Sequence, residues 1–442
     1  MSEVNNTEVI RKDKKKESLS SKLKMILINN SVTILFVVIC FIGIKLSKLP
    51  LFFIANELVT RLTRNSFLVL ALIIPVLAGM GLNFSITVGA MAAQIAIIAV
   101  THWGIPGIYG FLLAAVLSVP MSILFGKLIG KLLNKTRGQE MIASMIVGFF
   151  ANGLYQFLFL FLVGKIIPMK NPVLILNNGV GVRNSVDLSR NNGIKYSLDK
   201  IFELPLFYVL LGVSIIAFVY FLFKLIKISK SKAEDADKFK AIANLILCLV
   251  VVTISFTILF INSIPQQYKA LKNIQLPIIT SLVVGVSCLF NVLIVKTKIG
   301  QDFRTVGQDQ HIAEVSGINV DKTRVLAITI STVLAAWGHL IFLQNIGTLN
   351  TYGSHVQIAT FSIAALLIGG ASVSKATIGQ ALLGVILFHT LFIVSPKAGK
   401  NLFGEAQIGE FFRAFVAYGV IGVSLGLHAW KKRVEMKNKL KP

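Results

Sequence analysis

Two long stretches of this chain contain no aspartate, glutamate, lysine or arginine, and they restrict the possible folds more than any other feature. The first runs from Asn65 to Gly126 and the second from Val325 to Ser374. A helix that crosses a bilayer needs about 20 predominantly apolar residues, so the first stretch alone holds about three crossings. The rest of the chain agrees, because 55% of all residues are apolar and 14% are charged. We therefore expect an all-α, polytopic integral membrane protein.

About twelve apolar runs follow one another, and the basic links between them indicate their orientation. Lysine and arginine gather on the cytoplasmic side of membrane proteins. With both termini in the cytoplasm, every strongly basic link falls on that side, provided that residues 65–101 count as two spans. These links are residues 127–137, 224–240, 296–324, Lys375 and 431–437. We expect a cytoplasmic tail at 1–24, a transmembrane domain at 25–430 and a second cytoplasmic tail at 431–442.

Two further regions are interpreted as connections. Residues 49–64, which include Arg61 and Arg64, are expected to be a short link between the first two spans. Residues 164–205 are polar, contain prolines and asparagine pairs, and lie on the extracytoplasmic side by parity.

The link between the first two spans of the uncharged region 65–126 is unusual, because it carries no basic residue. It must lie at residues 79–85, and we infer a helix break that is partly inside the protein. Unwound backbone at membrane depth is tolerated where protein or a water-filled cavity satisfies it, and broken helices often line substrate sites. The candidates for a translocation pathway here are Asn83, Ser85, Thr87 and Gln94. The alternative is that these side chains hold helices together.

Asn152 and Gln156 extend this set of candidates. They are four residues apart in an apolar run, so they share one face of a helix. Amide side chains are costly against lipid, so we expect that face to point inward, toward the pathway.

The largest polar island in the second half of the chain is the segment from Gly300 to Arg324. Within it, Gly307 and Gly317 bracket residues 308–316, which could form about two turns of helix, with the glycines allowing sharp turns on either side. A helix this short is not stable alone in water. It must dock on the membrane domain or on a partner, and we interpret the segment as a coupling element.

Several motifs in this chain, taken together and in order, resemble those of ABC transporter permeases of the simple-sugar, nucleoside and branched-chain amino acid class. In the coupling segment the matching positions are Gly300, Val306, Gly307, Ala313 and residues 316–320 (SGINV). The others are residues 81–89 (GLNFSITVG), 331–338 (STVLAAWG), 368–372 (IGGAS) and 379–384 (GQALLG). The resemblance leaves out the N-terminal tail and roughly residues 165–276.

The resemblance implies the permease subunit of an importer in the plasma (inner) membrane of a bacterium. Its core would have about ten helices, and an inserted helical hairpin at 227–276 would bring the total to twelve. The implied partners are a separate ABC ATP-binding subunit, a second permease subunit, identical or related, and an extracytoplasmic solute-binding protein. The cytoplasmic coupling loop would be 299–324, and the residues in contact with the ATP-binding subunit would be Gly307, Gln308, Ala313, Glu314, Ser316 and Gly317.

Other functions find less support in the sequence. No GxxxxGK[ST] motif is present, so we expect ATP hydrolysis on a partner chain and no bound cofactor. The net charge of +25 is spread over many short loops, which does not indicate nucleic-acid binding. Cys40, Cys248 and Cys288 lie in apolar runs without metal-ligand spacing. A stand-alone secondary carrier remains the alternative. Such carriers usually bury ionisable residues in their spans, and the expected spans of this chain contain almost none. The expected solute is a simple sugar or a nucleoside.

Overall fold

The computed structural model describes residues 30–190, 193–230, 235–261 and 265–415, with a few positions between 418 and 426. In this part of the chain, eight helices are long and apolar enough to cross a membrane. A ninth span results if α12 (Ile278–Ile294) and α13 (Lys298–Gln308), which meet at 72°, are counted together. Two shorter apolar helices, α3 (Ser31–Ser47) and α16 (Ser354–Ile368), bring the observed runs close to the expected number. The polytopic helical fold is confirmed, while the run expected at 411–430 is described only in part.

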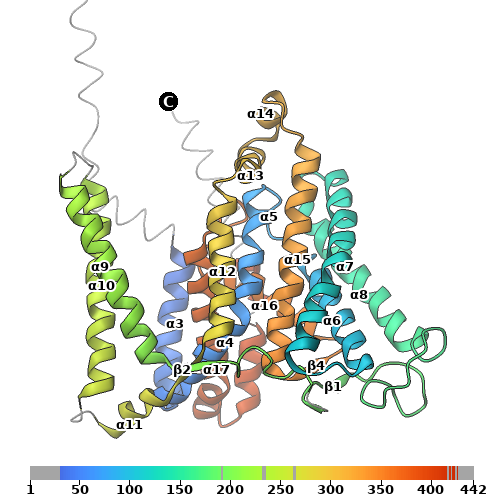
Figure 1. Cartoon of the computed structure of the whole chain (residues 1–442), viewed down its shortest axis with the longest axis horizontal. Coiled ribbons are helices and arrows are strands. Elements are labelled where there is room, and N and C mark those ends of the chain that lie inside the picture. The colour runs from blue at the N-terminus through green and yellow to red at the C-terminus, as the bar shows by residue number, and fades with distance from the viewer. Residues whose placement is uncertain are drawn as a thin grey trace, which may run out of the picture.

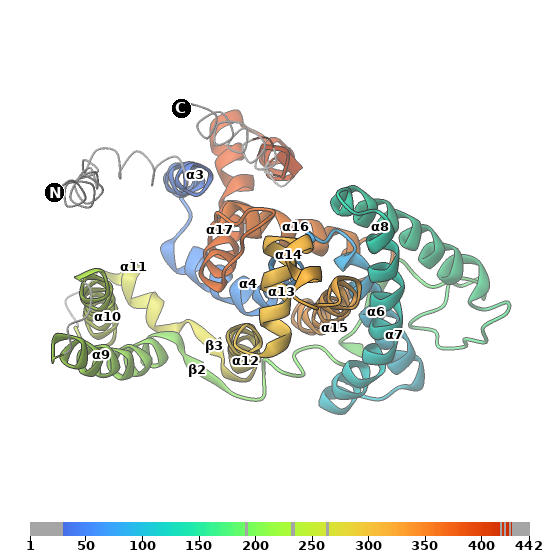
Figure 2. The ribbon, with the colours of Figure 1, turned by 90° about the horizontal axis from the view of Figure 1, so that it is seen from above.

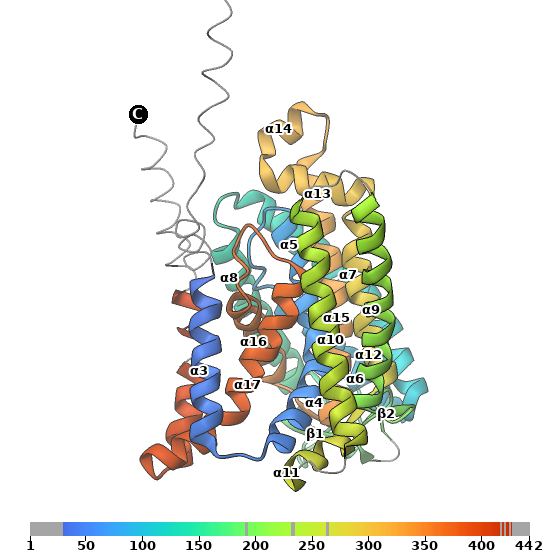
Figure 3. The same cartoon turned by 90° about the vertical axis from the view of Figure 1, so that its left-hand side faces the viewer.

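The helices run up and down between two ends of the molecule (Figure 1). The long ones in the first half are α4 (Leu51–Ala71) with its continuation α5 (Ile73–Leu77), α6 (Ile86–Trp103), α7 (Gly107–Lys135) and α8 (Glu140–Phe157), extended by the π-helical turn η1 (Leu158–Leu162). Those in the second half are α9 (Leu206–Lys230), α10 (Asp235–Phe260), α15 (Val320–Ile346) and α17 (Ile378–Phe403). The short helix α14 (Gln310–Val315) and α13 cap one end, shown at the top of Figures 1 and 3.

Helix α15 lies at the centre of the bundle and packs along α4, α6 and α7 (Figure 2). Glycines make these close crossings possible. A Cβ atom on Gly126 of α7 would lie 2.6 Å from the Thr329 Cα of α15, and one on Gly338 of α15 would lie 2.9 Å from the Leu68 backbone nitrogen of α4. The uncharged stretches of the sequence therefore form the core, and their small residues set the distances between its helices.

The expectation that residues 49–64 form a short connection is wrong. Helix α4 begins at Leu51, and with α5 it forms a span that ends at Leu77. Arg61 and Arg64 can lie on this span because the protein supplies partners for them. Arg61 Nε lies 3.3 Å from Glu57 Oε2, and Arg64 donates to Asn345 Oδ1 at 3.1 Å.

Residues 164–190 and 193–205 lie at the end of the bundle opposite α13 and α14, where two short two-stranded sheets form (Figure 1). Strand β1 (Ser185–Asp187) pairs with β4 (Thr348–Asn350), and β2 (Glu203–Pro205) pairs with β3 (Gln275–Pro277), both antiparallel. The buried Asp199 carboxylate accepts hydrogen bonds from Gln344 Nε2 at 2.9 Å and from Asn345 Nδ2 at 2.6 Å. The loop is thereby fastened to the end of α15.

Helices α9 and α10 form an antiparallel hairpin at the edge of the bundle (Figure 2). Most of their apolar side chains are exposed, as on helices that face lipid. The hairpin returns to the core through α11 (Gln266–Lys269), the 3-10 helix η3 (Ala270–Asn273) and β3. A small cluster with Phe207, Leu259, Leu271 and Ile274 at its centre joins it to α4.

Candidate coupling segment and translocation pathway

The coupling segment contains two helices, and only one of the two turns expected at Gly307 and Gly317 is present. Helix α13 continues through Gly307 to Gln308, so Gly307 does not form a turn. The turn comes instead at Asp309, whose Oδ1 accepts hydrogen bonds from the backbone N–H groups of His311 at 2.8 Å and Ile312 at 3.1 Å and thereby caps α14. The expected turn at Gly317 is present, with φ of 78°. Its neighbour Ile318 donates to Ala313 O at 3.0 Å, which closes α14 in a Schellman-type cap.

Gly307 instead provides close contact with the break between α5 and α6. A Cβ atom on Gly307 would collide with the Leu77 carbonyl oxygen, and one on Gly79 would lie 2.8 Å from Gly307 Cα. The break itself is buried, and Gly79 and Gly81 both have positive φ, at 72° and 67°, which glycine adopts at little steric cost. The coupling segment therefore rests directly on the unwound part of the first uncharged stretch.

One face of α14 is anchored and the other is exposed. Ala313 is fully buried against Val306 and Val320, which fixes α14 on α13 and α15. On the outer face, Ile312 and Val315 are 58% and 77% exposed. The other predicted contact residues of the segment are also exposed, namely Gln308, Glu314, Ser316 and Gly317. Sequence reasoning missed Ile312 and Val315, although two apolar residues at i, i+3 within a polar island are a recognisable signal.

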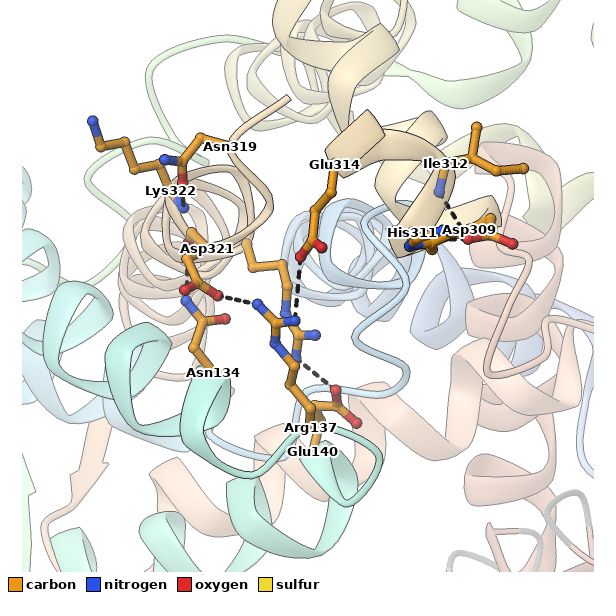
Figure 4. Close-up of polar contacts among 11 residues, drawn as sticks. Asn134, Arg137, Glu140, Asp309, His311, Ile312, Glu314, Asn319, Asp321 and Lys322 are labelled. Carbon is orange, nitrogen blue, oxygen red and sulfur yellow. Dashed lines mark hydrogen bonds and ion pairs between the residues drawn. The ribbon is translucent and has the colours of Figure 1, made fainter. Parts of the chain in front are cut away.

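Two arginines tie this segment to the turn between α7 and α8 and to the start of α8. Figure 4 shows one of them, Arg137, beside Glu314 and Asp321. Arg137 lies 3.4 Å from Glu314 Oε1 and 2.7 Å from Asp321 Oδ1, and the hydrogen bond to Asp321 raises the pKa of its guanidinium. Arg324 of α15 has a fully buried side chain and donates to Glu140 Oε1 at 2.6 Å. These ion pairs connect α14 and α15 to the start of α8, so a displacement of α14 would also displace that part of α8.

The Arg137 pairs should contribute little to stability. The Arg137 side chain is 42% exposed, and exposed ion pairs are worth about 0–1 kcal/mol. We expect Arg137→Ala to lower the free energy of unfolding by about 1 kcal/mol or less, and this difference should shrink further at about 1 M salt, where charges are screened within about 3 Å. Thermal unfolding of the protein in nanodiscs at low and high salt measures this. Arg190→Ala, which removes another exposed pair, is the matched control. A loss several times larger would mean that Arg137 carries structure beyond these pairs.

The first three pathway candidates lie at the break. Asn83 and Ser85 are buried, and Asn83 Oδ1 accepts from the Ser85 backbone N–H at 3.1 Å and from the Ser85 hydroxyl, so both side chains stabilise the turn. Thr87 lines a groove of about 540 Å³ between α6, α8 and α16, which Tyr418 and Ile421 near the C-terminal end also line. Other residues of that groove are Phe84, Met141, Met145, Gly148, Val356 and Thr360.

The other three candidates lie together at the start of α16, farther along the bundle. Gln94 Nε2 donates to Ser354 Oγ at 2.6 Å, and Asn152 Oδ1 lies 2.8 Å from His355 Nε2. Gln156 Nε2 donates to the same Asn152 oxygen at 3.5 Å. Ser354 and His355 were not singled out from the sequence, because their partners lie 260 and 203 residues away along the chain. In the part of the chain that is described, no group of three or more His, Cys, Asp or Glu side chains could hold a metal ion.

Comparisons with known proteins give a consistent picture. A family model described as "Branched-chain amino acid transport system / permease component" matches residues 194–421, a range that includes the α9–α10 hairpin. The chain is 34% identical over 169 residues to the autoinducer 2 import system permease protein LsrC of Enterobacter sp. (strain 638), a match that covers 37% of this chain and 47% of that protein. It is 26% identical over 163 residues to the xylose transport system permease protein XylH of Haemophilus influenzae, covering 37% and 41%.

A further relative is the probable ABC transporter permease protein YphD of Escherichia coli, at 29% identity over 149 residues, covering 34% of this chain and 43% of that protein. The chain spans about half the length of the curated relatives it matches. No solved structure matches.

Proposed function

The chain belongs to the family of permease components of branched-chain amino acid transport systems, and we propose that it is the subunit of an ATP-driven importer that forms the pathway for a small polar solute. As a member of this family with many apolar helices, it is a multi-pass protein of the bacterial inner membrane. The energy for transport would come from ATP hydrolysis on a separate subunit.

The observation that carries this proposal is the exposed face of α14. Ile312 and Val315 project from a helix of six residues that is held by its opposite face through Ala313. Exposed apolar residues on such a short, anchored helix fit a docking site for a partner protein. Gln308, Glu314 and Ser316 surround them with polar groups, as at the rim of a protein–protein interface.

Two contacts would carry movement of α14 into the membrane domain. The first is the contact of Gly307 with the break at Gly79. The second is a set of three ion pairs, two from Arg137 to Glu314 and Asp321 of the coupling segment and its continuation, and one from Arg324 to Glu140, which begins α8. Since Thr87 of α6 and the first half of α8 line opposite parts of the groove, a push on α14 would change the width of the groove.

The family and the residues together support a proposal for the solute and for the remaining partners. The printed names of two relatives concern autoinducer 2 and xylose, and each of the six candidate pathway residues carries an amide or a hydroxyl group. We infer a simple sugar or a nucleoside as the solute. A second permease subunit would close the groove beside Thr87, and an external solute-binding protein would deliver the solute at the end formed by residues 164–205.

A stand-alone secondary carrier is the second candidate, because a charge on a spanning helix favours it. Arg64 is half-buried on α4, with its single described hydrogen bond to Asn345, and ion-driven carriers commonly bury ionisable groups. Asn345 in turn donates to the Asp199 carboxylate, so the charge has a structural explanation in fastening the outer loop. We therefore place this candidate second.

Affinity purification from the native membrane in mild detergent, followed by mass spectrometry, tests the proposal. We expect a roughly stoichiometric protein with a GxxxxGK[ST] motif to copurify with the tagged chain. The double variant Ile312→Ser/Val315→Ser should lose it, whereas Ile299→Ser, which changes an exposed apolar residue of α13, should retain it. Retention by the double variant would contradict docking at α14. Uptake by the purified chain in ATP-free vesicles would favour the secondary carrier.

A further inference from the structure

A buried polar cluster joins α6, α8 and α16 near the first turn of α16, and the coupling mechanism does not use it. Three of its members are almost completely buried, since Gln94 and His355 are 0% exposed and Tyr155 is 5% exposed. The rings of Tyr155 and His355 lie 5.0 Å apart between centroids. We call the polar cluster the set Gln94, Asn152, Tyr155, Gln156, Ser354 and His355.

The hydrogen bonds of Gln94 leave an acceptor free. Its Nε2 donates to Ser354 Oγ at 2.6 Å, and Ser354 Oγ donates to Asn350 O at 2.9 Å. The Gln94 amide and the Ser354 hydroxyl therefore both donate to protein groups. Gln94 Oε1 is buried and has no hydrogen-bond partner among the described residues.

The imidazole of His355 leaves a second acceptor free. Asn152 Oδ1 faces its Nε2 at 2.8 Å and also receives the Gln156 amide, so this oxygen accepts and Nε2 carries the hydrogen. A fully buried imidazole with no carboxylate bonded to it is neutral, because burying its charge without a partner is unfavourable. Nδ1 is then an unprotonated acceptor, and it has no partner in the described part of the chain.

Tyr155 supplies a hydroxyl and an aromatic surface. Its Oη is buried without a hydrogen-bond partner among the described residues, while its ring packs at 4.6 Å from Phe159 and at 5.0 Å from His355. Most buried polar groups in native proteins are hydrogen-bonded. Gln94 Oε1, His355 Nδ1 and the Tyr155 hydroxyl are three unsatisfied groups within one cluster, and hydroxyl groups of a ligand would satisfy all three.

We propose that the polar cluster is a binding subsite for a neutral, polyhydroxylated solute of the sugar class. This inference rests on the proposed transport function and adds the class of solute. Hydroxyl groups of the solute would donate to Gln94 Oε1 and His355 Nδ1 and would accept from the Tyr155 hydroxyl. The cluster contains no lysine or arginine, so a carboxylate or phosphate would enter a site that offers mainly acceptors. Amino acids and phosphorylated solutes are excluded on this ground.

Binding to the full-length chain in nanodiscs tests the subsite without any ATP-binding subunit. D-Xylose, D-ribose, uridine and L-leucine are the probes, and thermal unfolding against probe concentration is the readout. We expect a saturable rise in the unfolding temperature with at least one of the two sugars and none with L-leucine. Tyr155→Phe removes only the hydroxyl, and Gln94→Met keeps a similar shape but removes the whole amide, including its hydrogen bond to Ser354. Each variant loses one of the groups proposed to contact the solute, so each should weaken sugar binding about tenfold.

Ser362→Ala is the matched control, because Ser362 is a buried residue of α16 whose hydroxyl donates only to Ile358 O in its own helix. It should bind as the unchanged chain does. The subsite is overturned if neither sugar gives a saturable shift, if L-leucine gives one, or if Gln94→Met and Tyr155→Phe bind the sugars normally. A shift with uridine alone would also overturn the sugar class. Failure here leaves the copurification result at α14 untouched, so the two proposals fail separately.

Discussion

Replacing Gly307 with alanine is expected to reduce ATP-driven uptake by about tenfold or more, while the protein still inserts in the membrane. The added methyl group would collide with the Leu77 carbonyl oxygen and lie 3.0 Å from the Gly79 backbone nitrogen. Neither is the movable end of a side chain, so α13 must move away from the break. Overpacking of this kind costs about 1–3 kcal/mol, and each 1.4 kcal/mol changes a population about tenfold. The arrangement that transmits movement from α14 would become rare.

The measurement is solute uptake per inserted molecule, with membrane insertion followed by immunoblot. Gly153→Ala is the control, because a Cβ atom at this position of α8 meets nothing within 4 Å. Uptake by Gly307→Ala that equals uptake by the control would contradict transmission through this contact.

At Gly317, substitutions test whether transport depends on the backbone conformation of the coupling segment. It has φ of 78°, and a Cβ atom there also meets nothing within 4 Å, so only strain opposes a side chain. Asparagine tolerates the left-handed region whereas β-branched residues do not. Gly317→Asn should therefore transport, while Gly317→Val should abolish transport and leave insertion intact. At Gly307, where contact is limiting, Gly307→Asn should fail as alanine does.

The sequence was sufficient for the fold class because lipid imposes a simple rule on composition. Runs without charge longer than one span could only be membrane helices, and nearly every run that was expected is a helix. The rule failed at α4, where Glu57, Arg61 and Arg64 lie on a spanning helix. Counting charges treats each as solvated, and it cannot detect that Glu57 and Asn345 supply hydrogen bonds inside the protein.

At the coupling segment, a backbone turn could be predicted from the sequence, whereas contacts between residues that are distant in the chain could not. The turn at Gly317 needs a positive φ, which a glycine in that place indicates. Asp309 was missed as the residue that caps α14, and the importance of Gly307 lies in a neighbour more than two hundred residues earlier in the chain. His355 could not be selected from the sequence for the same reason, since its relation to Asn152 exists only in the folded bundle.

Removing the buried Arg324 guanidinium is expected to be the most destabilising single change near the coupling segment. Arg324→Met should lower the free energy of unfolding by about 3–5 kcal/mol, the range measured when one member of a buried ion pair is removed. The Arg324 side chain is 0% exposed and that of Glu140 is 12% exposed, so the remaining carboxylate would have little water to solvate it. Arg304→Met, which changes an exposed arginine of α13, should be nearly neutral.

The double variant Arg324→Met/Glu140→Met removes both charges. It therefore separates the attraction between Arg324 and Glu140 from the cost of leaving one charge buried without a partner. Buried pairs that are replaced together by apolar residues are often no less stable than before, because the desolvation cost disappears with the charges. We therefore expect the double variant to recover most of the stability lost by either single variant, as measured by thermal unfolding in nanodiscs. Its uptake should nevertheless remain low, since the ion pair that joins α15 to α8 would be gone. A double variant that unfolds as easily as the sum of both single changes would show that the pair is held for stability, and normal uptake by it would remove α8 from the proposed route of transmission.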